Sequence, residues 1–436
     1  FANVAKMRKV YVVGVGMTPF TKPKKDPKVQ PQFPELGKKA VERALEDAGL
    51  KDKRGLIEQA FVGCLFNVGA GQRILYACDI HGIPISNLNN ACATGSNALY
   101  LARQSVMSGL NECCLALGVE KMKPGSLGGG GDGGATALDE HYRVMYEARG
   151  IAKAPPMAQF FGGAGREHQA LYGTTDDQFA MIGEKNHRHS ANNPYSQFRD
   201  VYTLDQIKSA PKVFEMLTKT QCSPTSDGAA AAIVCSEDFV IKHGLQGQAI
   251  EIIAQSARTD SPSAFDQKNK KRTMIELIGS AMARNCANDV YQQSGLTPED
   301  VDVVELHDCF SANELITYEA LQLCGEGEGG KLIESGNATF GGKYVVNPSG
   351  GLISKGHPLG ATGIAQCAEL NWQLRGECGP RQVKDAKVGL QHNLGLGGLV
   401  VVTMYRKPEK WTGIAPKRAK SGAMGFPEDN AAASKL

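Results

Sequence analysis

The chain has 436 residues, of which 42% are hydrophobic and 21% are charged, and its formal net charge is only +3. Its longest apolar runs fall short of the roughly 20 residues that span a bilayer, so the composition predicts a soluble globular protein with no membrane span. The Lys/Arg clusters contain few aromatic residues, which argues against nucleic-acid binding. Each cluster is interpreted as solvated surface, although one of them could hold the phosphates of a nucleotide-like substrate.

Twelve cysteines and nine histidines are spread along the chain. The cysteines form no Cys-x-x-Cys pair, and several lie within apolar patterns, which favours free thiols in a reducing compartment. The one close histidine pair, His187 and His189, has no carboxylate or cysteine partner at metal-ligand spacing. The sequence therefore predicts no bound metal.

The first half of the chain is predicted to alternate strands and helices. A β-branched stretch at 10–15 indicates a buried strand, and a helix is expected from Glu35 after an irregular proline-rich stretch. A strand at 59–65 precedes a glycine-punctuated turn that carries Cys92, and this turn leads into an apolar helix ending near Gly109. This half is therefore predicted to contain, in order, a helix, a strand, a reactive turn and a second helix.

The character of the chain changes between residues 121 and 222, where a glycine-rich run at 128–134 is followed by polar helical segments. We interpret 121–222 as an inserted loop subdomain, so that the first half consists of residues 1–120 and 223–245. Long insertions at strand ends commonly shape substrate sites, although any single residue of the insertion could equally belong to a tolerated surface loop.

The second half, residues 246–406, repeats the order of the first. Its turn carries His357 where the first half carries Cys92, and an Ala-Thr-Gly sequence follows each turn. The repetition indicates a duplication, and the alternation of strands and helices predicts α/β layers with mostly parallel sheets. The expected elements are strands at 249–257, 301–306 and 399–405, helices at 274–293 and up to about Gly376, and a turn at 391–398.

The two matching turns supply a thiol and an imidazole, the parts of an activated thiolate nucleophile. Cys92 precedes Gly95 at a helix start, where unpaired backbone N–H groups favour a thiolate. His357 lies between Gly356 and Pro358, and a neutral imidazole there can accept the cysteine proton. A lone cysteine in an apolar helix is more often a small buried hydrophobe, and the histidine of a Gly-His-Pro sequence is more often hydrogen-bonded within its turn. Only the pairing of the two turns therefore favours a catalytic role for Cys92 and His357.

A third polar group, His307-Asp308-Cys309-Phe310, is expected at the end of the strand at 301–306 and just before a helix that begins near Ser311. This is the usual ligand edge of an α/β sheet, so Cys309 is a second candidate acid/base. The alternative is structural, with His307 and Asp308 as a polar cap and Cys309 in the core.

Together these segments resemble the thiolase superfamily from about Val10 to Tyr405. The motifs fall in the order that the family has. Asn90-Ala91-Cys92-Ala93-Thr94-Gly95-Ser96 looks like the nucleophile loop, Gly356-His357-Pro358 looks like the histidine loop, and the glycine turn near Gly395 looks like the last catalytic loop.

Two departures from the common pattern are similar to the sterol carrier protein type of thiolase. Most thiolases carry Cys-x-Gly in the last loop, where this chain has Asn393-Leu394-Gly395, and Asn-Glu-Ala-Phe where it has His307-Asp308-Cys309-Phe310. The second thiol has thus moved from one loop to another. This type can carry a lipid-transfer domain after the thiolase, and the roughly 30 residues after Tyr405 are too few to build one.

The resemblance implies two duplicated βαβαβαββ halves packed as a five-layered αβαβα structure, usually in a homodimer. It also implies a reaction in which His357 promotes attack by the Cys92 thiolate on the 3-keto carbon of a 3-ketoacyl-CoA. Cys309 would protonate the departing enolate of acetyl-CoA or propionyl-CoA and then activate incoming CoA. His307 would hold a water near one oxyanion, and the backbone N–H groups of Cys92 and Gly395 would face the other.

Two further residues lie close to these positions in the sequence. Asn393 lacks acid/base ability and is interpreted as a structural residue or as a polar neighbour of the site, and His392 beside it is an outside candidate. No bound cofactor is expected, because a thioester already stabilises the carbanion, and CoA is a cosubstrate.

The last three residues, Ser434-Lys435-Leu436, match the tripeptide address for peroxisomal import. They end a C-terminal extension at 407–436, which is polar and Ala-rich from Lys417. The chain starts at Phe1 without a signal-peptide pattern, so secretion is not expected. The expected location is the peroxisome, or a related organelle such as the glycosome, reached through the peroxisomal import receptor.

Three other functions remain open. Biosynthetic Claisen condensation of acyl-CoAs uses the same residues, although the import address favours breakdown of fatty acids or sterol side chains. A non-catalytic acyl-CoA or lipid-binding protein would not need Cys92, His307, Cys309 and His357 together. A cysteine hydrolase would release a free acid instead of transferring the acyl group to CoA.

Overall fold

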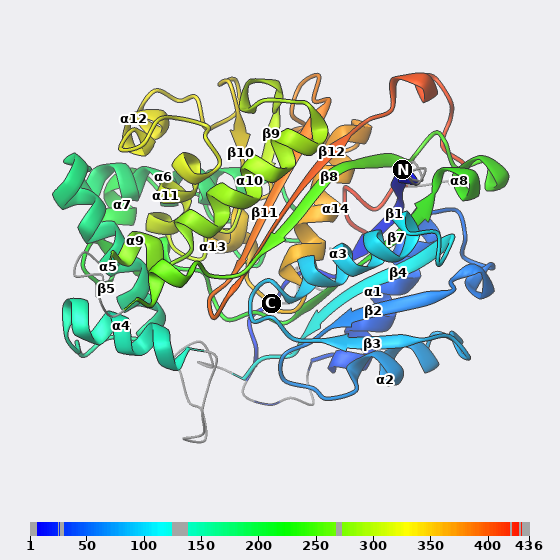
Figure 1. The fold of residues 1–436 in the computed structure, drawn as a ribbon, viewed down its shortest axis with the longest axis horizontal. Helices are drawn as coiled ribbons and strands as arrows, with labels where there is room; N and C mark the ends of the chain where they lie inside the picture. The colour runs from blue at the N-terminus through cyan, green and yellow to red at the C-terminus, as the bar shows by residue number, and fades with distance from the viewer. Residues whose placement is uncertain are drawn as a thin grey trace, which may run out of the picture.

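The computed structural model describes residues 7–24, 26, 30–123, 138–266, 273–418, 421–426 and 429. At its centre is a ten-stranded sheet in the order β10-β9-β11-β12-β8-β1-β7-β4-β2-β3 (Figure 1). The strands are β1 (Val10–Met17), β2 (Gln59–Gly63), β3 (Ile85–Leu88), β4 (Cys113–Glu120), β7 (Gly228–Ser236), β8 (Ile250–Arg258), β9 (Val303–Glu305), β10 (Val345–Val346), β11 (Val388–Gly395) and β12 (Leu399–Arg406).

The sheet is mixed, which corrects the expectation of mostly parallel sheets. Parallel pairing is confined to its two ends, β3-β2-β4 and β10-β9-β11, and the pairs between them are antiparallel. One cause is local. Residues 391–395, expected in a turn, belong to β11, so only residues 396–398 join it to β12, and so short a connection requires an antiparallel hairpin.

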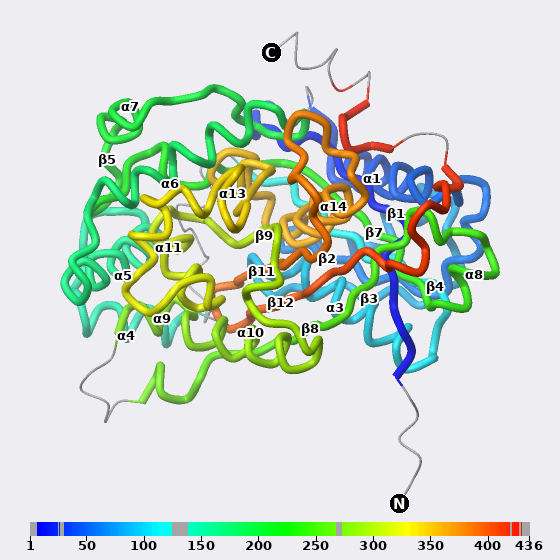
Figure 2. The backbone as a smooth tube through the Cα atoms, turned by 90° about the horizontal axis from the view of Figure 1, so that it is seen from above, coloured from blue at the N-terminus to red at the C-terminus, as the bar shows by residue number. Residues whose placement is uncertain are grey.

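Helices cover the outer faces of the sheet and also separate its two halves. α1 (Phe33–Asp47) packs on β1 and β7 of the first half, with α2 (Ala70–Tyr76) beside it, and α10 (Ser280–Ser294) packs on β8 and β12 of the second half. α3 (Thr94–Met107) and α14 (Thr362–Arg375) contact each other and strands of both halves. In Figure 2, α14 lies near the middle of the molecule. This is the predicted five-layered thiolase-type α/β fold.

The central helices α3 and α14 begin at the two Ala-Thr-Gly sequences and end close to Gly109 and Gly376, as predicted. Every residue of α14 except Arg375 is buried. A helix that is enclosed on all sides lacks the polar face of a surface helix. The duplicated turns therefore open into the interior of the molecule.

The expected single helix at 274–293 is two helices, α9 (Met274–Leu277) and α10. The break falls at Gly279, whose φ of 92° lies in the left-handed region that glycine tolerates. Periodicity alone does not detect such a break, because the apolar positions continue across it. The remaining helices of the second half are α11 (Ser311–Ala320), α12 (Gly329–Glu334) and α13 (Gly351–Lys355).

Between β4 and β7 the chain forms several helices and a short hairpin, which lie at the end of the molecule opposite α1 and α8 (Glu237–His243) (Figures 1 and 2). Phe160, Phe161 and Ile182 of this region share a hydrophobic core with Leu315 and Ile316 of α11. The region therefore packs beside the segment that carries His307 and Cys309. Its elements are α4 (Asp139–Arg149), α5 (Pro156–Tyr172), α6 (Asp176–Ser190), α7 (Leu204–Ser209), β5 (Lys212–Phe214) and β6 (Leu217–Thr218), and α8 (Glu237–His243) follows β7.

Some sequence features fall outside this description. The glycine-rich run at 128–134 and the terminal Ser434-Lys435-Leu436 lie outside the described residues. Among the helices that are described, none has both the length and the apolar character needed to cross a bilayer. All twelve cysteines are described, and each is a free thiol.

Candidate active site

Cys92 lies in a tight turn at the start of α3. The Thr94 hydroxyl donates to the carbonyl oxygen of Ala91 at 2.6 Å and accepts from the backbone N–H of Asn90 at 2.7 Å. Ala91 has a φ of 48°, which is strained for a residue with a side chain. The turn is therefore held in a conformation that local preference alone would not select, and this conformation presents the Cys92 sulfur.

His357 occupies the corresponding turn before α14. Its Nδ1 lies 2.8 Å from Thr362 Oγ1, and that hydroxyl donates its own hydrogen to the carbonyl oxygen of Pro358 at 2.9 Å. Thr362 can therefore only accept from His357, so Nδ1 carries the proton and Nε2 keeps its lone pair. Nε2 is buried and has no hydrogen-bond partner among the described residues.

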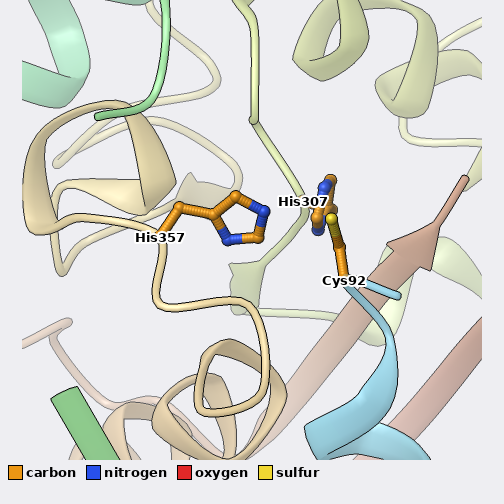
Figure 3. A group of neighbouring side chains, drawn as sticks. All are labelled: Cys92, His307 and His357. Atoms are coloured by element: carbon orange, nitrogen blue, oxygen red, sulfur yellow. The ribbon is translucent and has the colours of Figure 1, made fainter. Parts of the chain in front are cut away.

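The two turns meet, and His307 joins them (Figure 3). The Cys92 sulfur and one ring nitrogen each from His307 and His357 all lie within 4.8 Å of one another. The two imidazole rings stand edge to face, with centroids 5.1 Å apart and planes at 83°. Residues from three separate loops thus place a thiol and two imidazoles in one group, which is also a ligand set suited to a transition metal.

Burial determines the protonation of this group. It lowers the pKa of His357 to about 3, so the imidazole is neutral at physiological pH. Cys92 is partly exposed as a residue, but its thiol is enclosed by protein, and this burial raises the pKa of the thiol to about 12. The helix start therefore does not by itself produce the expected thiolate. The resting pair is a neutral thiol beside a neutral base.

His307 is hydrogen-bonded to Asn393, the residue that replaces the usual cysteine of the last loop. Asn393 Nδ2 lies 3.0 Å from His307 Nδ1, and Asn393 Oδ1 is buried without a partner among the described residues. Burial first, and then the neighbouring His357 and His392, lower the pKa of His307 well below its usual value. The His392 ring accepts from the backbone N–H of His307 through Nδ1 at 3.4 Å, and it does not join the group of three.

Cys309 lies close to this group but outside it. Its thiol is buried, which raises its pKa well above the usual value, and the charge of a Cys92 thiolate raises it further. The segment of Cys222 and Ser223 runs alongside, because the Ser223 N–H donates to the Cys309 carbonyl oxygen at 2.8 Å. Cys222 is thus a third thiol in the neighbourhood, which the sequence pattern did not indicate.

Gly395 lets the last loop approach the Cys92 turn. A Cβ at this position would lie 2.3 Å from the carbonyl oxygen of Asn90 and 2.9 Å from the backbone nitrogen of Ala93. Both contacts are with backbone, so neither turn could move aside cheaply. The close approach places the backbone of Gly395 next to that of the Cys92 turn.

Two buried carboxylates fix the loops of His307 and His357 to each other. Asp308 accepts from the backbone N–H groups of Leu352 and Ile353 in the first turn of α13, at 2.7 and 3.2 Å. Glu305, at the end of β9, accepts from Lys355 Nζ at 3.0 Å, and Lys355 is two residues before His357. Sequence reasoning gave no role to Thr362, Glu305 or Lys355, although the repeated Ala-Thr-Gly pointed at Thr362.

Two thiolase family models match the chain. The model "Thiolase, N-terminal domain" matches residues 10–202, and "Thiolase C-terminal domain-like" matches residues 264–404. Sterol carrier protein 2 of Rattus norvegicus is 53% identical over 428 residues, which is 98% of this chain and 74% of the rat protein. Non-specific lipid-transfer protein-like 2 of Caenorhabditis elegans is 48% identical and the acetyl-CoA acetyltransferase of Methanothermobacter thermautotrophicus is 35% identical, over 91% and 92% of this chain and 96% and 100% of theirs.

Solved structures share the fold. The Ltp2-ChsH2(DUF35) aldolase has a TM-score of 0.75 at 21% identity, and human mitochondrial 3-ketoacyl-CoA thiolase in complex with CoA has a TM-score of 0.66 at 19% identity. Each comparison covers 92% of this chain and 98% of the other. The resemblance to thiolases that the sequence motifs indicate is confirmed. Relatives that are about 50% identical to this chain carry the name sterol carrier protein 2, and the chain belongs to the thiolase family of acyltransferases.

Proposed function

We propose that the chain cleaves 3-ketoacyl-CoA with CoA through an acyl-Cys92 intermediate, giving acetyl-CoA or propionyl-CoA and a shortened acyl-CoA. One observation carries the proposal. His357 Nε2 has no hydrogen-bond partner among the described residues and faces the Cys92 sulfur (Figure 3), and the Thr362 hydroxyl keeps that nitrogen in its proton-accepting form. A thiol next to an oriented neutral base is the arrangement that nucleophilic acyl transfer requires.

In the first stage His357 Nε2 accepts the Cys92 proton as the sulfur attacks the 3-keto carbon. The bond between the 2- and 3-carbons then breaks and leaves an acyl thioester on Cys92, and Cys309 donates its proton to the departing enolate. The raised pKa of the Cys92 thiol fits proton transfer during attack better than a preformed thiolate. Splitting the reaction through a covalent intermediate lowers the barrier of each step.

In the second stage the Cys309 thiolate takes the proton of incoming CoA, whose sulfur attacks the acyl-Cys92 thioester. Cys92 leaves as a thiolate and recovers its proton from His357. His307 serves as the group that positions a water or donates to an oxyanion, because Asn393 Nδ2 faces its Nδ1 and leaves Nε2 to carry a hydrogen. The backbone N–H groups of Cys92 and Gly395 are assigned to the other oxyanion.

The biological setting is part of the same proposal. The address Ser434-Lys435-Leu436 supports a degradative role in the peroxisome or glycosome, in breakdown of fatty acids or sterol side chains. Family membership supports a homodimer and residues 121–222 as an insertion between the two portions of the first half. An acetyltransferase acting on acetyl-CoA among the relatives and a CoA-bound thiolase among the solved structures support CoA as cosubstrate.

The proposal is tested by following loss of acetoacetyl-CoA in the presence of CoA. We expect Cys92→Ala to lower kcat by about 10³-fold or more, since removal of a nucleophile disables the whole catalytic unit. Cys309→Ala should turn over slowly and show an acyl adduct on Cys92 by intact mass. Cys324→Ala, half-buried between α11 and α12, is the matched control and should retain full activity.

The same assay separates the alternatives. Unchanged turnover in the Cys92 variant would exclude the mechanism, and an adduct on Cys309 would reverse the two thiol roles. Release of free acid in place of acyl-CoA would indicate a hydrolase. Net condensation of acetyl-CoA under the same conditions would favour the biosynthetic direction.

A further inference from the structure

We propose that Cys92, His307 and His357 also form a binding site for Zn²⁺, which occupies the group in place of substrate and reversibly blocks it. The spacing of histidines and cysteines along the sequence gave no sign of such a site, since the three residues lie more than 200 and then 50 positions apart in the chain. The fold brings them together. Their ligand atoms, one sulfur and two ring nitrogens, lie within 4.8 Å of one another.

The atoms are the right kind and are nearly at coordination distance. Zinc binds cysteine sulfur at about 2.3 Å and histidine nitrogen at about 2.0 Å, so tetrahedral ligands stand roughly 3.5 Å apart. Closing the group therefore needs shifts of about 1 Å, which rotation of the three side chains can supply. Each side chain comes from a different loop, and in Figure 3 all three point toward one another. A fourth position would remain for water, as in zinc sites with three protein ligands.

The outer nitrogen of His357 already has the partner that a metal-bound histidine needs, and His307 Nδ1 lies 3.0 Å from an amide that can supply one. A coordinating imidazole donates its other N–H to an acceptor, which fixes the ring and strengthens the ligand. The Thr362 hydroxyl accepts from His357 Nδ1 and leaves Nε2, buried and without a partner among the described residues, facing the group. For His307, turning the Asn393 amide by half a turn would bring Oδ1, which is buried and has no partner among the described residues, onto Nδ1.

Binding uses the two atoms on which the proposed reaction depends. The Cys92 thiol loses its proton to solvent as the sulfur–zinc bond forms, so that Zn²⁺ and the thiol give a zinc thiolate and one H⁺. Zinc also takes the Nε2 lone pair of His357. Acylation of Cys92 and zinc binding are then mutually exclusive. Inhibition rests on the proposed function, whereas binding itself does not.

The binding test uses the full-length protein, stripped of metal with a chelator and titrated with Zn²⁺ by calorimetry. Co²⁺ titration replaces Zn²⁺ to detect the visible bands of tetrahedral cobalt with a thiolate ligand. We expect one ion per chain at this site, and affinity falling by about 100-fold or more in Cys92→Ser, His307→Ala and His357→Ala, since each removes a ligand. Alkylating Cys92 in the unmutated protein should have the same effect, which guards against variants that fail to fold.

Cys324→Ala and His243→Ala remove a thiol and an imidazole that do not belong to the group of three, and should leave the affinity unchanged. Retained zinc affinity after Cys92 alkylation, or cobalt spectra without thiolate ligation, would overturn the proposal. Acyl-Cys92 formation measured by mass in metal-free protein keeps the two ideas separate. If zinc binds but no adduct forms, the proposed function fails while the metal site stands. If an adduct forms but zinc does not bind, the metal site fails while the proposed function stands.

Discussion

Thr362 decides which nitrogen of His357 carries the proton. Its hydroxyl is committed as a donor to Pro358 and so acts only as an acceptor toward Nδ1. Thr94 makes the equivalent bond in the other duplicated turn, where its hydroxyl donates to Ala91 and holds the Cys92 loop. The threonine of each Ala-Thr-Gly therefore sets the geometry of the reactive residue before it, and in the His357 copy it also sets the tautomer.

Replacing Thr362 with valine is expected to lower kcat by about 10²-fold with little change in KM, because His357 loses the acceptor that keeps Nε2 free. Thr362→Ser keeps the hydroxyl and should restore most of the activity. Steady-state kinetics gives the kcat and KM split, and ¹⁵N NMR of the imidazole reports the tautomer. Equal activity of the valine and serine variants would show that the hydrogen bond from His357 to the Thr362 hydroxyl does not control turnover.

Helix α13 connects the loop of His307 to the loop of His357. Asp308 caps its first turn, and Lys355 in its last turn pairs with Glu305, with both ionic side chains almost fully buried. The cap residue lies between His307 and Cys309, and the last turn leads directly into His357. Any tilt of this helix would move His357 relative to His307. The buried pair of Lys355 and Glu305 therefore holds the two histidines in position and also contributes to stability.

Lys355→Met should lower the free energy of unfolding by about 3–5 kcal/mol near neutral pH, since it leaves Glu305 buried without its partner. Burial already raises the pKa of Glu305, and loss of Lys355 raises it further, so the folded protein binds a proton that the unfolded chain releases. The destabilisation should therefore grow as pH rises from 5 to 8. Urea denaturation at several pH values measures it, and the Glu305→Gln/Lys355→Met double variant should be the more stable. A loss independent of pH would contradict this account.

The two halves of the molecule meet at the glycines of the repeated Ala-Thr-Gly. A Cβ on Gly95 would lie 2.7 Å from the carbonyl oxygen of Gly360, and one on Gly363 would lie 2.3 Å from the backbone nitrogen of Ser96. The starts of α3 and α14 are thus in backbone contact across the centre of the molecule. This contact, together with the pairing of β1 and β8, brings the Cys92 turn to the His357 turn.

Gly363→Ala is expected to destabilise the protein by about 1–3 kcal/mol and to reduce turnover, because the added methyl group must push α3 and α14 apart. Gly55→Ala is the matched control. A Cβ at Gly55 meets open space, so its effect should stay within about 0.5 kcal/mol. Denaturation and the acetoacetyl-CoA assay measure both variants. Comparable stability of the two would mean that the helix contact relaxes without strain.

The sequence by itself determined the duplication, the reactive turns at Cys92 and His357, the ends of the helices that follow them, and the family. Each of these depends on short stretches whose propensities and glycine positions act locally. Strand direction, the break at Gly279 and membership of β11 by residues 391–395 were decided by pairing between distant segments, which periodicity does not encode.

Only the tertiary structure decided the chemistry at the site. The grouping of Cys92 with His307 and His357, the bond from Asn393, and the neutral state of the thiol all arise where loops remote in sequence exclude water from one another. Desolvation depends on everything that surrounds a group, so the pKa of Cys92 follows from the packed molecule and not from its place at a helix start.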